Sequence, residues 1–197
     1  MSKNTIDKDY TERLVDKQFV WWKTLLDVQR PYRYNINKLD LGFVLDIGCG
    51  IGRNLLHLKG NGVGVDHNKD SVAICMEKGL KAYTNEEFLS SEYNKEKTFD
   101  SILLAHVAEH MTEQQATALL KEYLPFLKDN GKVVVITPQE AGYASDQTHV
   151  QFTDFEVVKR IFSEIGVVEK KFYSFPFPRF VGKFFKYNEF ISVAQKN

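Results

Sequence analysis

Short apolar runs alternate with helix-like stretches along residues 43–137, and this alternation most constrains the fold. Strands are predicted at residues 43–47, 62–65, 80–83, 101–104 and 132–137. Helices are predicted between them, at residues 52–59, 69–78 and 113–128. Strands that alternate with helices form βαβ units and a buried parallel sheet. The sequence therefore predicts an α/β fold, a doubly wound Rossmann-like sheet with helices on both faces.

The pattern changes in the last quarter of the chain. Residues 153–165 are predicted to form a helix that stops at Gly166. Two strand-like segments follow, near residues 167–174 and 188–195, and the stretch between them has no helical pattern. Strands joined without a crossover helix favour antiparallel pairing. The predicted sheet has seven strands and is mostly parallel, with a terminal antiparallel strand.

A chain of 197 residues suits one domain, so residues 1–197 are predicted to form a single domain. Residues 1–38 are expected to be a helical extension or lid on a core of residues 39–197. A helix is predicted at residues 7–28, and Pro31 ends or interrupts that region. Tyr10, Trp21, Trp22, Arg30 and Tyr32 could close over a substrate, although packing in the core is the simpler explanation.

Composition limits the partners and the compartment. The formal net charge is zero, which disfavours nucleic acid, because neutralised phosphates supply most of the affinity of such complexes. Cys49 and Cys75 form neither a disulfide framework nor a zinc pattern. No apolar run is long enough to span a bilayer, and residues 1–14 lack a signal-peptide core. We expect a cytoplasmic protein that does not bind membranes.

The segment from Val44 to Asn54, VLDIGCGIGRN, carries the chemistry. A glycine-rich turn between a strand and a helix lets a ligand approach the backbone and directs amide groups at a negative group. A dinucleotide site is the obvious rival. The spacing here is G-x-G-x-G, and Asp46 would repel a pyrophosphate but attract a cationic ligand. Asp66, which ends the second strand, can accept hydrogen bonds from ribose hydroxyls.

These segments, followed by FDSILLAHVAEHM, resemble the class I S-adenosylmethionine-dependent methyltransferases over roughly residues 40–195. The closer likeness is to bacterial small-molecule enzymes of the methyltransferase type 11 kind. The resemblance implies a seven-stranded sheet whose last strand is antiparallel. It also implies an enzyme (EC 2.1.1.-) with S-adenosylmethionine as its cofactor.

The resemblance implies roles for matching positions. The methionine part of the cofactor would be lined by Asp46, Gly48, Gly50 and Gly52. Asp66 would hold the ribose, and His67 would lie against the adenine. Residues Thr84–Phe88 would also contact the adenine, with Glu86 and Glu87 available. Ala105 and His106 would border the sulfonium.

Histidines after the fourth and fifth strands are the candidate catalytic residues. His106 and His110, four residues apart around Glu109, also suit a metal-binding helix, but the sequence shows no third ligand and we predict no metal. The segment from Asp146 to Phe152 resembles a D-P-T-H-V-like stretch in the same enzymes. His149 in it is a candidate general base, with His106 as the other candidate. The alternative is that His149 orients the next helix.

The predicted function is methyl transfer to a small-molecule acceptor, a metabolite or a sugar intermediate, by positioning of the acceptor. The alternative is a non-catalytic cofactor-binding or partner-activating module of the same fold, and an NAD-dependent oxidoreductase is less favoured. Arg30, Arg33 and Arg179 could bind an anionic group. The aromatic stretch Phe172–Phe190 could be a dimer surface, an acceptor-site wall or simple packing. The oligomeric state is not predicted.

Overall fold

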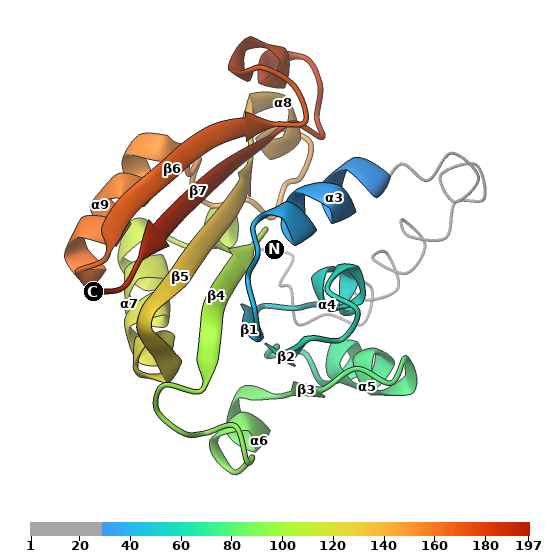
Figure 1. The fold of residues 1–197 in the computed structure, drawn as a ribbon. Helices are drawn as coiled ribbons and strands as arrows, with labels where there is room; N and C mark the ends of the chain where they lie inside the picture. Colours follow the sequence, from blue (N-terminus) through green and yellow to red (C-terminus); the bar gives the residue numbers. More distant parts are fainter. Residues whose placement is uncertain (1–28) are drawn as a thin grey trace. The chain divides into compact units, whose positions relative to one another are not determined.

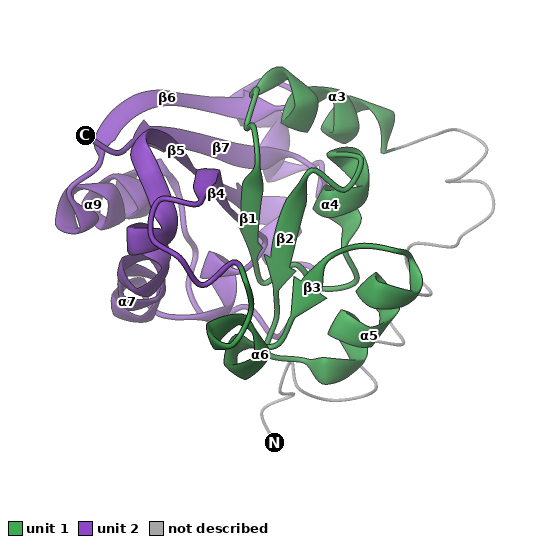
Figure 2. Ribbon diagram, turned by 60° about the horizontal axis from the view of Figure 1, so that its bottom comes forward, with its two compact units in different colours: residues 1–92 green, residues 93–197 purple. Residues whose placement is uncertain are grey.

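The computed structural model describes residues 29–197. The chain divides into two compact units, residues 1–92 and 93–197 (Figure 2). The helix predicted at residues 7–28 lies outside the described residues, as do Tyr10, Trp21 and Trp22. A single domain over the whole chain stays a prediction. Within residues 29–197, no helix has both the length and the apolar character that crossing a membrane demands.

The first unit contains three short parallel strands in the order β3-β2-β1 (Figure 1). The strands are β1 (Val44–Ile47), β2 (Gly62–Val65) and β3 (Ala82–Tyr83). Its helices within residues 29–92 are α3 (Arg30–Lys38), α4 (Arg53–His57), α5 (Lys69–Glu77) and α6 (Asn85–Leu89). The predictions for β1, β2, α4 and α5 are confirmed within a few residues, and β3 is shorter than predicted.

Side chains fix where the helices of this unit begin. Pro31 lies in the first turn of α3, where its missing N–H is not needed. Asn68 caps α5 by accepting hydrogen bonds from the amides of Asp70 and Ser71. Thr84 and Glu87 form a capping box at the start of α6. The start of each of these helices is therefore set by local chemistry.

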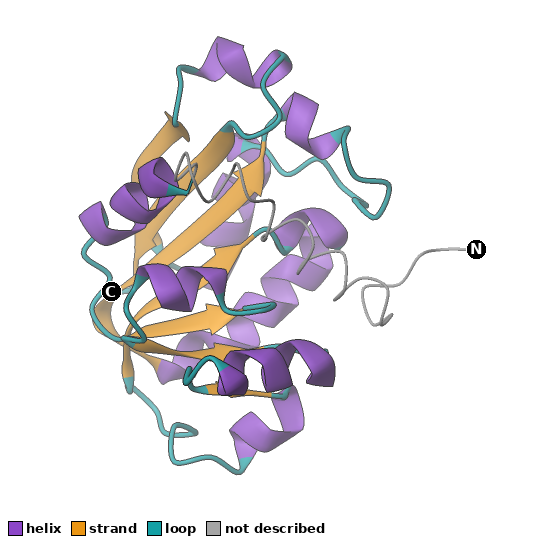
Figure 3. Ribbon diagram, turned by 90° about the vertical axis from the view of Figure 1, so that its right-hand side faces the viewer, coloured by secondary structure: helices purple, strands orange, loops and turns teal. Residues whose placement is uncertain are grey.

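The second unit has four strands in the order β4-β5-β7-β6. They are β4 (Phe99–Ala105), β5 (Leu127–Pro138), β6 (Val168–Phe175) and β7 (Glu189–Gln195). The helices are α7 (Glu113–Tyr123), α8 (Glu140–Tyr143) and α9 (Phe155–Ile165), with 3₁₀ turns η1 (Ala108–His110), η2 (Leu124–Phe126) and η3 (Arg179–Lys183). Figure 3 shows the helices and loops that join these strands.

Strand β7 lies between β5 and β6 and runs antiparallel to both. The predicted pairing of the last two strands is therefore confirmed. Strands β4 and β5 are parallel and longer than predicted, with Ile102–Leu104 paired to Val133–Val135. These residues are buried, as expected for continuous apolar runs in a parallel sheet.

Helices α7 and α9 pack against each other beside this sheet (Figure 1). Helix α9 buries Val158, Ile161 and Phe162 and exposes charged residues on its other side. Asp154 caps its N-terminus, and Gly166 ends it with a left-handed φ of 75°. The predicted stop at Gly166 is confirmed.

Candidate functional site

The glycine-rich loop follows β1 and precedes α4. Gly48, Gly50 and Gly52 all have positive φ, at 69°, 53° and 80°. A Cβ atom on Gly52 would also lie 2.5 Å from Cδ1 of Leu80 and 3.0 Å from Sγ of Cys75. Both the backbone conformation and the surrounding packing therefore require glycine at this position.

Most amides of this loop are used to shape the loop itself. The amides of Gly48 and Cys49 donate to the carbonyl of Val65, over 2.7 and 3.2 Å. The amide of Gly52 donates to the carbonyl of Cys49. The glycines therefore allow a tight turn and a close approach of a ligand to the backbone. The amides of Gly48, Cys49 and Gly52 are used within the protein and do not point at a ligand.

Asp66 joins the loop after β1 to the turn after β2. Its Oδ2 accepts from the amide of Gly50 over 2.7 Å, and its Oδ1 accepts from the amide of Asn68 over 2.9 Å. Each carboxylate oxygen can accept a further hydrogen bond. The neighbouring side chain of His67 is half-exposed, with Nδ1 3.6 Å from Oδ1 of Asp66.

Asp46 is a buried carboxyl group that accepts no hydrogen bond of good geometry. Asp46 is 1% exposed, and neither of its carboxyl oxygens has a hydrogen-bond partner among the described residues. Burial raises the pKa of Asp46 to about 7, against the lowering effects of nearby Arg53 and Asn54. An unpartnered buried carboxyl group is costly and attracts a cationic ligand.

Cys49 is a small packed residue. It is buried and unoxidised, and its Sγ would lie 2.5 Å from a Cβ atom on Gly64. The Sγ of Cys75 donates to the carbonyl of Gly50 over 3.2 Å. Both thiols therefore help to hold the glycine-rich loop.

In the second unit, His106 lies between two carboxylates. Its Nε2 is 2.9 Å from Oε1 of Glu189, and its Nδ1 is 3.3 Å from Oε1 of Glu109. Burial lowers the pKa of His106, but hydrogen bonds and charges from Glu109 and Glu189 outweigh it and raise the pKa to about 9. Glu189 was not predicted as a site residue; its only signal in the sequence is an acidic residue at the start of an apolar strand.

The backbone of His106 is also unusual. It follows Ala105 at the carboxyl end of β4 and has a positive φ of 59°. Its amide still donates to the carbonyl of Ile136, which continues the ladder to β5. A non-glycine residue with positive φ at the end of a strand is uncommon and marks a candidate functional position.

His110 and His149 lie side by side, with ring centroids 4.8 Å apart. Nδ1 of His110 is 3.2 Å from both the carbonyl oxygen and the hydroxyl oxygen of Thr148. Nδ1 of His149 is 2.7 Å from the carbonyl of Tyr143, whose ring stacks on the imidazole. The structure therefore brings the loop after β5 to the turn after β4.

Other predicted residues are engaged in local structure. The predicted adenine contacts at Thr84–Phe88 include the capping-box residues Thr84 and Glu87, while Glu86 is exposed. Arg179 makes two hydrogen bonds to Glu140 and lies over the ring of Phe190, 4.6 Å from its centroid. Its guanidinium is therefore already paired with a carboxylate.

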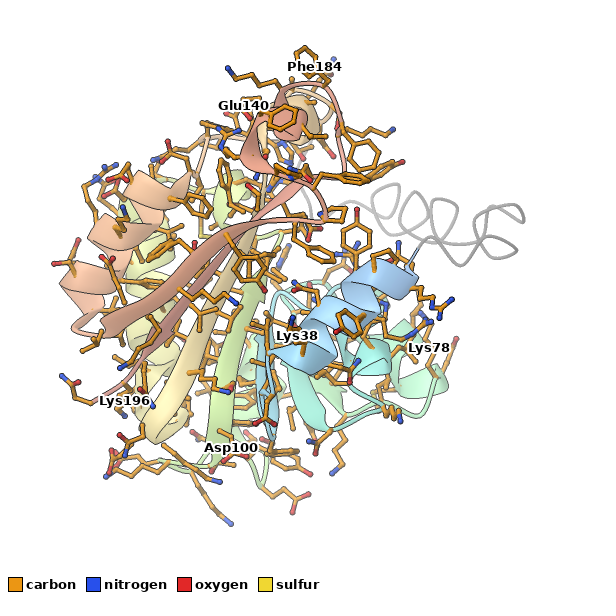
Figure 4. The ribbon with its side chains drawn as sticks, turned by 45° about the horizontal axis from the view of Figure 1, so that its top comes forward. Lys38, Lys78, Asp100, Glu140, Phe184 and Lys196 are labelled. Carbon is orange, nitrogen blue, oxygen red and sulfur yellow. The ribbon has the colours of Figure 1, made fainter. Side chains whose placement is uncertain are left out.

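The aromatic stretch divides into a packed part and an exposed part. Phe172 packs edge-on against Phe155, and Phe190 is buried. Phe177, Phe180 and Phe184 are exposed. Figure 4 shows Phe184 at the same end of the second unit as Glu140, where η3 and α8 meet.

Comparisons with known proteins agree on one family. Residues 27–168 match the family model described as a methyltransferase domain. A curated relative, an uncharacterized methyltransferase of Bacillus cytotoxicus, is 26% identical over 152 residues, which cover 66% of this chain and 71% of that protein.

Solved structures share the fold. A methyltransferase of Thermotoga maritima, described as a possible histamine N-methyltransferase, has a TM-score of 0.69 at 18% identity, covering 94% of this chain and 97% of its own. An S-adenosylmethionine-dependent methyltransferase of Archaeoglobus fulgidus has a TM-score of 0.66 at 21% identity, with 88% and 99% covered. The magnesium protoporphyrin IX methyltransferase of Synechocystis has a TM-score of 0.59 at 14% identity, with 87% and 82% covered. The predicted Rossmann-like fold, with a seven-stranded, mostly parallel sheet, is confirmed.

Proposed function

Because the chain belongs to the methyltransferase-domain family and is an enzyme that uses S-adenosylmethionine, we propose that it methylates a small-molecule acceptor, a metabolite or a sugar intermediate. The observation that carries the proposal is Asp46, a buried carboxyl group without a hydrogen-bond partner beside a glycine-rich loop. A cationic cofactor would compensate its burial, and a pyrophosphate would not.

The residues of the first unit fit S-adenosylmethionine. Asp46 would receive the ammonium group, and Gly48, Gly50 and Gly52 would leave room for the methionine part. The free lone pairs on the oxygens of Asp66 would accept from the ribose hydroxyls. His67, with its half-exposed side chain, would lie against the adenine.

The cofactor supplies a methyl group on a positively charged sulfur, which is already a strong electrophile. The protein's contribution is therefore to align the acceptor and exclude water. The roles of Ala105 and His106, at the end of β4, at the sulfonium stay predictions. His106 with Glu109 and Glu189 carries one positive and two negative charges, so the cluster is net negative and suits a cationic neighbour.

Of the two candidate bases, His149 is better suited than His106 to accept a proton. Both ring nitrogens of His106 face carboxylate oxygens, which can only accept, so both nitrogens carry protons. Nδ1 of His149 faces a carbonyl, which leaves Nε2 with a lone pair. A base is needed only where the acceptor must lose a proton.

The small-molecule acceptor is supported by charge and by similar proteins. The chain is neutral, whereas nucleic-acid acceptors favour a basic surface. Two of the similar solved structures are named for small acceptors, a magnesium protoporphyrin and, as a possibility, histamine.

The test is calorimetric titration of the full chain with S-adenosylmethionine, its demethylated product and NAD. The first two should bind and NAD should not. Asp66→Asn and Asp46→Asn should each weaken binding about tenfold or more, since each removes a charged partner. Asp70→Asn, at an exposed position in the first turn of α5, is the matched control and should bind normally. Binding of NAD alone would overturn the proposal.

The alternative is a module that binds the cofactor without turning over an acceptor. The positive φ of His106 and its two carboxylate partners favour a working site, because such strain and pairing are not needed to hold a sheet. Methyl transfer from labelled cofactor to any member of a metabolite panel decides between the two. Binding without transfer, alone or with a partner, would support the module.

A further inference from the structure

Three side chains of types that commonly bind metal ions lie close together in the second unit. One ligand atom from each of Glu109, His110 and His149 can be chosen so that all three lie within 4.8 Å of one another. Glu109 and His110 belong to η1, whereas His149 lies in the loop between α8 and α9. From this cluster we propose that Glu109, His110 and His149 bind a divalent first-row transition-metal ion.

The tautomers of the two histidines follow from their partners. Nδ1 of His149 faces the carbonyl oxygen of Tyr143, which can only accept, so this nitrogen carries the proton. The hydroxyl of Thr148 donates to Asp146 over 2.8 Å, so toward Nδ1 of His110 it acts as an acceptor. The carbonyl of Thr148 accepts from the same nitrogen. Both imidazoles therefore keep the Nε2 lone pair that binds a metal.

This arrangement is the one that metal-binding histidines show. Such histidines donate their second ring N–H to a carbonyl or carboxylate, which fixes the tautomer and the ring orientation. The Tyr143 ring, stacked 5.2 Å from the imidazole of His149, further restricts it. No hydrogen bond to either Nε2 is found within residues 29–197.

Glu109 supplies an independent observation that points to a ligand. Glu109 is 1% exposed, and its Oε2 has no hydrogen-bond partner in the described part of the chain. Its Oε1 is held by His106 at 3.3 Å. A buried carboxylate oxygen without a partner is costly, and a bound cation would satisfy it.

The backbone holds the two segments together before any ion binds. The carbonyl of Glu109 accepts from the amides of Val150 and Gln151, over 2.7 and 3.2 Å. His149 directly precedes these residues, so its position is fixed against η1. Ligand atoms of the three side chains lie within 4.8 Å of one another, whereas metal–nitrogen distances are about 2.1 Å, so each side chain would move by about an ångström to bind an ion.

The donor set indicates the class of ion. Two imidazoles and one carboxylate suit zinc, iron(II), cobalt(II) or manganese(II), whereas magnesium and calcium prefer oxygen ligands alone. Three protein ligands leave positions open for water or another oxygen donor. An ion and a proton compete for Nε2 of His149, so this proposal gives His149 a different role from that of a base.

The test is titration of the chelator-treated full chain with cobalt(II), followed by its visible absorption, and with zinc by competition. Wild type should bind a single equivalent. His149→Gln and Glu109→Gln should weaken binding about 100-fold or more, because each removes a ligand. His67→Gln, at a half-exposed histidine of the first unit, is the control and should bind like wild type.

The proposal would be overturned if wild type binds cobalt(II) no tighter than millimolar, or if His149→Gln binds it with wild-type affinity. It would also be overturned if His67→Gln loses binding while the variants of the proposed ligands keep it. Circular dichroism checks that each variant is folded. If Glu109→Gln fails to fold, His149→Gln decides alone, since its side chain is part-exposed in a loop. None of these readouts depends on methyl transfer, so failure here leaves the proposed function standing.

Discussion

Nε2 of His106, at the end of β4, lies 2.9 Å from Oε1 of Glu189, the first residue of β7. The two residues are 83 positions apart in the sequence. This contact joins the centre of the predicted site to the strand that completes the sheet of the second unit. The histidine and its acid are therefore expected to affect stability as well as the site.

Glu189→Ala should destabilise the protein by about 1–3 kcal/mol, because it leaves a part-buried imidazolium with one carboxylate instead of two. Glu189→Gln should recover part of the loss, since its amide oxygen still accepts from the ring. Urea unfolding at pH 7 measures both. Glu169→Ala, at an exposed position on β6, should change little, and an equal loss there would contradict the assignment.

Asp46 should make the cofactor-free protein less stable as the pH rises. The folded protein holds this proton up to a pH of about 7, whereas the unfolded chain loses it near 3.8. Between these values the unfolded chain binds fewer protons, so the free energy of unfolding falls with pH, by a few kcal/mol in total. Asp46→Asn should lack this fall. Urea unfolding from pH 4 to 8 measures the free energy of unfolding of wild type and Asp46→Asn. If the two free energies change with pH in parallel, Asp46 does not cause the fall.

Cofactor binding should release protons near neutral pH. If the ammonium group of the cofactor pairs with Asp46, it favours the ionised carboxylate and lowers the pKa from about 7. Calorimetry at pH 7 in buffers of different ionisation enthalpy measures the protons released. Asp46→Asn should lose this component. If the wild type binds the cofactor without releasing protons, the ammonium group does not pair with Asp46.

Gly64→Ala should weaken cofactor binding about tenfold through the packing under the loop. The added Cβ atom would lie 2.5 Å from Sγ of Cys49 and 2.9 Å from Cδ1 of Leu55. Such overpacking costs about 1–3 kcal/mol and displaces Cys49. Gly60→Ala is the comparison, because no atom lies within 4 Å of its Cβ position and its only cost is the backbone strain of alanine at a φ of 75°. Calorimetric affinities of both variants decide, and equal affinities would contradict the prediction.

Thr148→Val should weaken metal binding about tenfold, although Thr148 is not a ligand. It removes the hydroxyl that accepts from Nδ1 of His110 and donates to Asp146. Thr148→Ser keeps the hydroxyl and should restore the affinity. The cobalt(II) titration measures the affinity of both variants. An equal loss of affinity in Thr148→Val and Thr148→Ser would show that the hydroxyl is not the cause.

Local chemistry made most of the fold predictable. Strand β2 was predicted at Gly62–Val65, where it is found, because its apolar run is bounded by polar residues and Asp66. The short helix α6 was not predicted as a helix, although Thr84 and Glu87 have the spacing of a capping box. Strand β5 begins at Leu127, earlier than predicted, because Leu127 pairs with Phe99 of β4 ahead of the regular register that starts at Lys132.

The long-range contacts of the site could not be predicted. No periodicity places His149 beside Glu109, because that contact depends on hydrogen bonds from Val150 and Gln151 to the carbonyl of Glu109. Glu189 likewise reaches His106 only through the position of β7 between β5 and β6. The sequence could name the chemical groups, but the tertiary fold decides which of them meet.

The position of β7 has a consequence for synthesis of the chain. Translation delivers β6 before β7, yet β6 pairs with no other strand among the described residues. Until Glu189–Gln195 emerges, β5 and β6 each present an unpaired edge, the kind of surface that promotes aggregation. The nascent second unit is therefore most vulnerable just before its last strand is made, and it is the same strand that brings Glu189 to His106.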